Sequence, residues 1–252
     1  MPYVAHFSDR FRDVVKGRTN TNEVSVKGYC TGAVYLLDIM KNCLSGSCTN
    51  IGMEPMFTHP RNAVNYVECH DNMTSWDKLK ECCKEDSKEV RIARAKMLMA
   101  AVLLAQGIHS GQEFARSKHG LPNTYEESDE INKLDYLRRN QYQDMVKITK
   151  DLIRIRKEHP ILRYSMKEDV EQHVSFSDIA QKVLLYKIRD EHDDMVIIFN
   201  PTGEYFSYEF EAAYPLLYYN GASEDILIKK VNIEPYSTIV FSRNDFLKPG
   251  IR

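Results

Sequence analysis

Apolar and polar positions follow different patterns in the two parts of the chain. Up to about residue 157, short apolar runs are mixed with helical periods, whereas later residues alternate in the manner of strands. The run AVNYVEC at residues 63–69 is short, rich in β-forming residues and has little polar alternation. This is typical of a strand buried on both faces of a parallel sheet, so we predict such a strand over residues 63–69.

Two longer segments have the spacing of helices. The first covers residues 88–106, with Gly107 placed to end it. The second covers residues 140–157 and stops at His159-Pro160. Its apolar face consists of Met145, Ile148, Leu152 and Ile155.

The second part of the chain predicts several short strands at a spacing of roughly ten residues. The runs begin at residues 183, 195, 205, 215 and 237. Turn signals stand between them at residues 200–203 (NPTG) and 220–221 (NG). Strands of this length and spacing indicate an antiparallel sandwich.

The order strand, helix, strand, helix and all-β tail predicts an α/β chain. We expect the C-terminal part of a (β/α)8 TIM barrel, followed by an all-β antiparallel sandwich domain. A complete barrel takes about 250 residues, so residues 1–160 hold only a partial catalytic barrel, about strands six to eight. The sandwich domain is expected at residues 161–252.

Composition and charge limit the classes of binding partner that can be expected. The chain has 252 residues, 34 basic and 36 acidic, with a net charge of -2. This balance gives no electrostatic reason to expect nucleic acid or a membrane. No apolar signal core opens the chain and no stretch approaches 18 uncharged apolar residues, so we expect a cytoplasmic protein.

Six cysteines are present, and free thiols in a reducing cytosol are the expected state. Cys43 and Cys48 are spaced so that they could close a small loop in an oxidising compartment, and Cys82-Cys83 is a vicinal pair. The spacing does not suggest zinc.

The cluster Glu68-Cys69-His70-Asp71-Asn72 directly follows the predicted buried strand. Active sites of α/β barrels are built at the C-terminal ends of such strands. A carboxylate there can stabilise positive charge or bind hydroxyl groups, and the imidazole can hydrogen-bond a ligand. The alternative is a polar loop that caps the next segment through its Asp and Asn.

Other polar segments can be interpreted either as functional sites or as structural features of their loops. The segment SDRFRD at residues 8–13 is interpreted first as an ion-pair network after a strand. Glu113 is either catalytic or an anchor of its loop, and we favour the anchor. The loop with Asn123, Tyr125 and Asn132 can line a sugar site, because aromatic rings stack on pyranose faces.

Two rival chemistries are set aside. Cys69 and His70 could be a thiol nucleophile and its base, but adjacent residues of a strand point to opposite faces. A metal site at His70, Asp71 and Glu113 lacks paired-histidine spacing, so no metal is predicted.

Three segments closely resemble the pullulanase branch of glycoside hydrolase family 13, and they occur in the order of that family. Residues 64–79 (VNYVECHDNMTSWDKL) resemble the family's fourth conserved region, and residues 6–17 (HFSDRFRDVVKG) its sixth barrel strand. The segments LLAQGI, HSGQEFARSKHG, NTY and INKLDY, within residues 103–136, resemble the eighth strand and the loop after it. The resemblance covers residues 1–165 and implies the C-terminal portion of a type I pullulanase.

The resemblance implies a retaining hydrolase of α-1,6-glucosidic linkages without a cofactor. Asp71 matches the carboxylate that stabilises the transition state, and His70 matches the histidine that hydrogen-bonds the same sugar. Asn72 is expected near the site, while Trp76 and Asp77 support its loop. By resemblance, the substrate rim consists of Glu113, Asn123, Tyr125 and Asn132.

The nucleophile and the general acid of the family belong to the fourth and fifth strands, which precede the matching region. Asp13 is rejected as nucleophile because its context is the sixth strand. The chain is therefore expected to be inactive alone, to need the missing N-terminal half of the barrel, and to bind α-glucans such as pullulan, glycogen and branched dextrins. The alternative is a non-catalytic carbohydrate-binding or complementing subunit of a split glucan hydrolase.

Two departures from the family pattern touch this region. Ile108 runs straight into His109 where the family has about three more apolar residues, so the eighth strand is expected to be short. Met73 and Ser75 stand in the loop where histidine or leucine is more usual.

Overall fold

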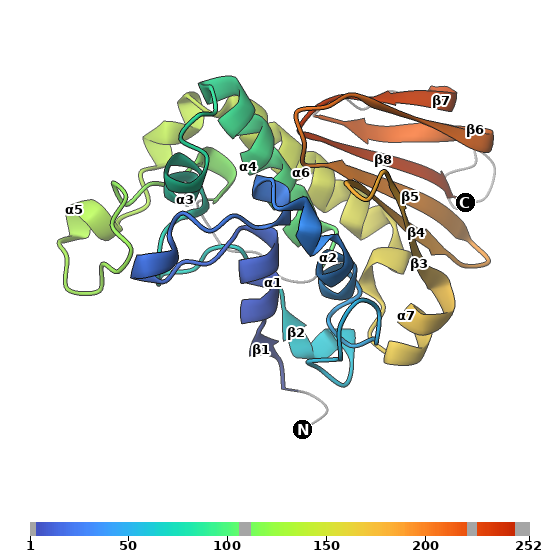
Figure 1. Cartoon of the computed structure of the whole chain (residues 1–252), viewed down its shortest axis with the longest axis horizontal. Helices are drawn as coiled ribbons and strands as arrows, with labels where there is room; N and C mark the ends of the chain where they lie inside the picture. Colours follow the sequence, from blue (N-terminus) through green and yellow to red (C-terminus); the bar gives the residue numbers. More distant parts are fainter. Residues whose placement is uncertain (1–3, 106–111, 221–225, 245–252) are drawn as a thin grey trace.

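The computed structural model describes residues 4–105, 112–220 and 226–244. Its helices are α1 (Asp9–Val15), α2 (Leu37–Leu44), α3 (Ser75–Cys82), α4 (Lys88–Leu103), α5 (Asp129–Asn132), α6 (Gln143–Glu158) and α7 (Lys167–His173). Its strands are β1 (His6–Phe7), β2 (Ala63–Val64), β3 (Val174–Ile179), β4 (Val183–Arg189), β5 (Asp193–Asn200), β6 (Phe206–Tyr219), β7 (Leu227–Ile233) and β8 (Ser237–Asn244). Figure 1 shows the strands β3 to β8 on one side of the molecule and most helices on the other.

The C-terminal strands form one antiparallel sheet in the order β3-β4-β5-β8-β6-β7. Strand β6 pairs with β7 from Phe206 to Pro215 and with β8 from Leu216 to Tyr219, with register shifts in both ladders. An apolar cluster joins Phe210 of β6 and Val231 of β7 to Val183, Val196 and Phe241 of the strands β4, β5 and β8. The predicted antiparallel β region is confirmed, but its described strands are hydrogen-bonded into one sheet and not into two separate ones.

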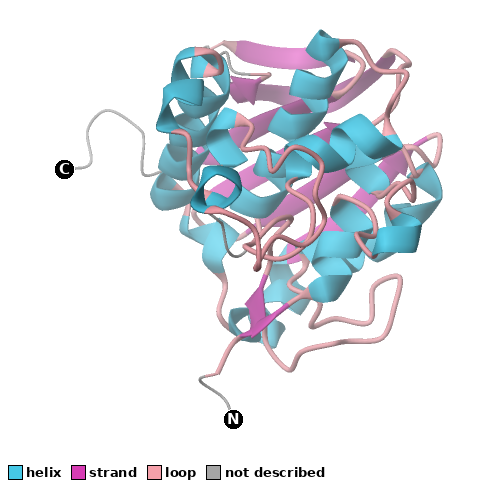
Figure 2. Cartoon of the chain, turned by 90° about the vertical axis from the view of Figure 1, so that its left-hand side faces the viewer, coloured by secondary structure: helices cyan, strands magenta, loops and turns pink. Residues whose placement is uncertain are grey.

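The other face of this sheet is covered by helices, which Figure 2 shows in front of the strands. One hydrophobic cluster joins Leu98 and Leu152 of the helices α4 and α6 to Ile197 and Val240 of the sheet. Both helices match the predicted ones closely, and α6 buries the four apolar residues predicted for it. Gly107, predicted to end the first helix, lies outside the described residues.

Helix α4 begins where Ser87 accepts a hydrogen bond from the backbone N–H of Val90. Its residues 97–103 are all buried, so this half of the helix has no solvent face. Helix α4 therefore lies within the main hydrophobic core of the molecule. No helix in the described parts of the chain is long and apolar enough to cross a membrane.

The predicted barrel strands are short. Strands β1 and β2 pair in parallel, with His6 opposite Ala63 and Phe7 opposite Val64. The expected eighth strand with its Ile108-His109 junction lies outside the described residues. A parallel pair of two-residue strands does not show a TIM barrel, and the division at 160/161 stays a prediction.

Candidate functional site

Residues 65–74 join β2 to α3 as an irregular segment. The predicted strand over residues 63–69 is therefore wrong beyond Val64. Residues 65–68 are buried, as a central strand would be, but among the residues that the structure describes no ladder hydrogen bonds continue past Val64. The segment still emerges from the C-terminal end of a parallel strand and carries the predicted site.

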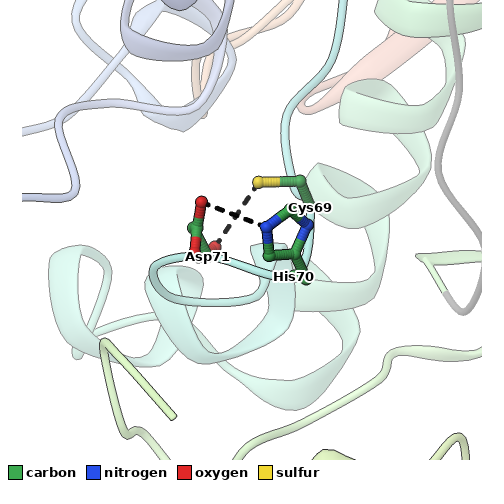
Figure 3. A group of neighbouring side chains, drawn as sticks. All are labelled: Cys69, His70 and Asp71. Carbon is green, nitrogen blue, oxygen red and sulfur yellow. Dashed lines mark hydrogen bonds and ion pairs between the residues drawn. The ribbon is translucent and has the colours of Figure 1, made fainter. Parts of the chain in front are cut away.

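His70 and Asp71 lie at the tip of this segment and point toward each other (Figure 3). The His70 Nε2 and Asp71 Oδ2 atoms are 3.3 Å apart, and the two side chains are 81% and 58% exposed. The next residue, Asn72, has a φ of 59°, a left-handed conformation that asparagine tolerates better than most residues. The turn thus presents an imidazole and a carboxylate together to solvent, and Asn72 beside them is half-buried.

Cys69 belongs to the same group. Its thiol donates to the backbone carbonyl of Asp71 at 3.7 Å, and one ligand atom each from Cys69, His70 and Asp71 lie within 4.8 Å of one another. Contrary to the expectation, Cys69 and His70 do not diverge, because these residues are not in a strand. The sequence prediction of no metal site did not consider this cluster.

Two buried lysines hold the backbone of the segment by hydrogen bonds to its carbonyl groups. The Lys118 ammonium donates to the carbonyl of His70, and the Lys16 ammonium donates to the carbonyl of Met73, each at 3.2 Å. Burial lowers the pKa of Lys118, and burial lowers the pKa of Lys16 to about 8. These lysines fix the backbone on both sides of Asp71, and sequence analysis missed them.

Glu68 is the buried acid of the segment. One of its carboxylate oxygens accepts a hydrogen bond from the backbone N–H of Ser75 at 2.7 Å. Burial raises the pKa of Glu68, and the nearby positive charge of Lys16 opposes that rise. Glu68 therefore ties the segment to the start of α3 and is not available to a ligand.

Asp77 supports the segment through Lys118, while such a role for Trp76 stays a prediction. Asp77 accepts hydrogen bonds from the Ser117 hydroxyl and from the backbone N–H of Lys118, both at 2.6 Å. Trp76 packs edge-on against Tyr142 with ring centroids 5.3 Å apart. Helix α3 is thereby joined to the loop that carries Lys118.

The predicted rim residues lie on the loops after residue 112. Asn123 and Tyr125 are exposed, Tyr125 at 77%, while Glu113 is half-buried in a short 3-10 helix. The amide of Asn132 accepts from the Thr124 hydroxyl at 2.6 Å and donates to the carbonyl of Thr124 at 2.7 Å. Asn132 thus shapes the loop from within, and a substrate-binding role for these four residues stays a prediction.

A pocket of about 290 Å³ opens beside this loop. Its lining includes Arg116, His119, Ile131, Lys133 and Arg138. The seven predicted site residues lie outside that lining.

The segment at residues 8–13 is an ion-pair network, as first interpreted. Arg12 contacts Asp9 at 3.0 Å and Asp13 at 2.7 Å. The segment is helical, because the Ser8 hydroxyl caps α1 by accepting from the backbone N–H of Phe11. Asp13 is thus engaged by Arg12, and its rejection as a nucleophile stays a prediction. The six cysteines are free thiols, Cys43 and Cys48 included.

No protein-family model matches the chain. Among curated proteins, the pullulanase of Bacillus subtilis (strain 168) is 34% identical over 206 residues, which cover 79% of this chain and 28% of that protein. Pullulanase A of Streptococcus pneumoniae serotype 2 is 25% identical over 253 residues, which cover 78% of this chain and 20% of that protein. The chain thus spans less than a third of either relative.

Solved structures match nearly the whole chain. The crystal structure of pullulanase type I from Bacillus subtilis str. 168 complexed with maltose has a TM-score of 0.89 and 30% identity, covering 97% of this chain and 36% of that one. A pullulanase from Anoxybacillus sp. LM18-11 complexed with maltotetraose has a TM-score of 0.86 and 30% identity, covering 95% and 35%. By both sequence and structure, this chain belongs to the pullulanase family and corresponds to the C-terminal portion of a type I pullulanase.

Proposed function

We propose that the chain supplies the sugar-binding segment of an α-glucan debranching hydrolase that cleaves α-1,6-glucosidic linkages with retention. The observation that carries the proposal is the exposed His70–Asp71 pair on a backbone held by two buried lysines. Two related pullulanases of known structure are complexed with maltose and with maltotetraose. A short α-glucan is therefore the ligand class that we assign to this pair.

In this proposal Asp71 stabilises the transition state of glycosidic cleavage, in which the anomeric carbon becomes partly cationic. Its carboxylate is exposed and hydrogen-bonds a hydroxyl of the sugar, while the His70 imidazole binds a second hydroxyl. The lysines act on the carbonyls of residues 70 and 73, so they leave both side chains free to face a sugar.

We infer from the resemblance that the chain lacks the nucleophile and the general acid, and that it does not hydrolyse glycosidic bonds alone. Retaining hydrolysis needs two carboxyl groups about 5 Å apart on either side of the scissile bond. Asp71 matches neither of them by resemblance. The pure 252-residue chain should release no reducing sugar from pullulan, and measurable release would disprove this inference.

Binding tests the segment directly. Maltotetraose is titrated into the chain by calorimetry, and Asp71→Asn should weaken binding about tenfold, since a hydrogen bond to a charged group contributes roughly 1.5 kcal/mol or more. The matched control is Glu191→Gln, because Glu191 is also an exposed acid 3.3 Å from a histidine, His192. Equal affinities of the wild type and the Asp71→Asn variant would contradict the role of Asp71.

A second candidate is a subunit that complements a separate N-terminal half of the barrel. Two observations favour it: the chain spans 28% of its Bacillus subtilis relative, and β1 pairs only with β2 among the described strands, leaving Phe7 60% exposed. An open strand edge is a template for pairing with further strands. Mixing the chain with an N-terminal pullulanase half that carries the nucleophile and acid should restore release of reducing sugar. An inactive mixture that forms no complex in gel filtration would rule this candidate out.

A further inference from the structure

Three different donor groups meet at the tip of the segment between β2 and α3. They are the thiol of Cys69, the imidazole of His70 and the carboxylate of Asp71, shown together in Figure 3. One ligand atom from each lies within 4.8 Å of the other two. His70 Nε2 and Asp71 Oδ2 are already 3.3 Å apart.

We propose that Cys69, His70 and Asp71 form a three-ligand site for Zn²⁺. Zinc binds sulfur at about 2.3 Å and nitrogen or oxygen at about 2.0–2.2 Å. Two ligands at such bond lengths on a tetrahedron stand roughly 3.4 Å apart, close to the distance between the His70 and Asp71 atoms. Magnesium and calcium prefer all-oxygen ligands, so a thiol and an imidazole select a softer cation.

The surroundings of the cluster fit a site with an open position. The side chains of His70 and Asp71 are largely exposed, so a cation can enter and keep a water molecule as the fourth ligand. The backbone does not have to be ordered on binding, because Lys118 holds the carbonyl of His70 and Lys16 holds that of Met73. Only the three side chains need to rotate toward a common point.

Binding replaces the thiol proton of Cys69 with the metal. The thiol releases one proton to solvent, and the resulting thiolate donates its electron pair to Zn²⁺, while neutral His70 and ionised Asp71 add one donor each. A cation bound there occupies both groups that we assign to the sugar. The site itself depends only on the three donors and does not rest on the proposed glucan binding.

The test uses the 252-residue chain without glucan. Zn²⁺ is titrated by calorimetry in a buffer that does not bind metals, and Co²⁺ is titrated in parallel because its thiolate complex has a characteristic charge-transfer absorption. The wild type should bind one equivalent of Zn²⁺ and show that absorption. Cys69→Ser should abolish the absorption, and both Cys69→Ser and Asp71→Asn should weaken Zn²⁺ binding at least about tenfold, the minimum expected when a group that positions a metal ligand is lost.

Two controls separate this site from other donors. His192→Gln removes an exposed histidine whose Nε2 is also 3.3 Å from a carboxylate but which belongs to no thiol-containing cluster of the described residues. Cys82→Ala removes the vicinal thiol whose sulfur lies 3.7 Å from that of Cys83. Both variants should bind Zn²⁺ like the wild type. Unchanged affinity in Cys69→Ser and Asp71→Asn, or loss of the bound equivalent in Cys82→Ala, would overturn the proposal.

Discussion

Arg94 joins the centre of the molecule to its C-terminal sheet, and its removal gives the most direct test of how the two parts hold together. Its Nε atom lies 2.7 Å from the carboxylate of Asp86, and both side chains are 6% exposed. Its Nη1 atom donates to the carbonyls of Cys30 at 3.3 Å and Pro201 at 3.1 Å. The guanidinium also lies 4.5 Å from the ring centroid of Tyr236.

The substitution Arg94→Met keeps most of the side-chain volume and removes the charge. It leaves the Asp86 carboxylate buried without its partner, which typically costs 3–5 kcal/mol, that is, about 4 kcal/mol here. The loss of hydrogen bonds to two carbonyls acts in the same direction. For a chain of this size, such a loss lowers the melting temperature by on the order of 10 °C.

Urea denaturation followed by the fluorescence of Trp76, the single tryptophan of the chain, measures the loss. The matched control is Arg154→Met, which breaks the exposed ion pair with Glu158 at 2.8 Å. Exposed pairs contribute about 0–1 kcal/mol. Combining Arg94→Met with Asp86→Asn should recover part of the loss, because no charge is then left buried. If Arg94→Met cost no more than Arg154→Met, the reasoning would be refuted.

Three further substitutions test the support of the irregular segment at residues 65–74 and the contact between the N-terminal part of the chain and the sheet. Asp77→Asn should lower the free energy of unfolding by about 2 kcal/mol in urea denaturation, because the acid accepts from the backbone N–H of Lys118 at 2.6 Å; a neutral result would remove Asp77 as a support. Burial lowers the pKa of Lys16 to about 8, so the unfolded chain binds more protons between about pH 8 and 10.5. Stability relative to Lys16→Met should therefore rise with pH across this window, by up to about 3 kcal/mol, and a flat difference would contradict the buried charge. Tyr29→Phe should cost about 1–3 kcal/mol by calorimetric melting, since the hydroxyl donates to the carbonyl of Lys182 at 2.8 Å inside the core; an unchanged melting temperature would exclude this contact as stabilising.

The elements that could be predicted from the sequence are those whose buried residues recur with the spacing of a helix or form a continuous apolar run between turns. Helix α6 has a single apolar face, and the strands β4, β5 and β8 are apolar runs between turn residues, so their patterns identify them. The two strands predicted from residues 205 and 215 are one strand, β6, which changes partners near Pro215. Pro215 is compatible with a strand at this point, because the ladders on either side of it are irregular.

The strand predicted over residues 63–69 fails for a different reason. Asn65, Tyr66 and Val67 are buried as in a central strand, so the burial was inferred correctly. Burial alone does not establish ladder pairing, and within the described ranges of the chain the pairing ends at Val64. A short apolar run also cannot be assigned to strand or helix by periodicity. The pairing partner lies in long-range structure that no local pattern encodes.

The candidate site was predicted unevenly for a similar reason. Adjacent positions made it certain that His70 and Asp71 would be close, and the support from Asp77 was expected by resemblance. The lysines that hold the segment come from 48 and 57 residues away along the chain. Lysine is almost always a surface residue, so neither Lys16 nor Lys118 could be distinguished from solvated neighbours before the fold was known.

The shared core around α4 limits how this chain can be altered. Its apolar side chains fill the space between the N-terminal segments and the sheet, so neither side has a finished surface of its own. A different β region could replace this one only if its apolar residues packed against the helices α4 and α6 in the same way. Recombination near residue 160 would therefore leave the core between the helices and the sheet incomplete. We expect this region of the family to change by single substitutions at that contact and not by exchange of the whole β region.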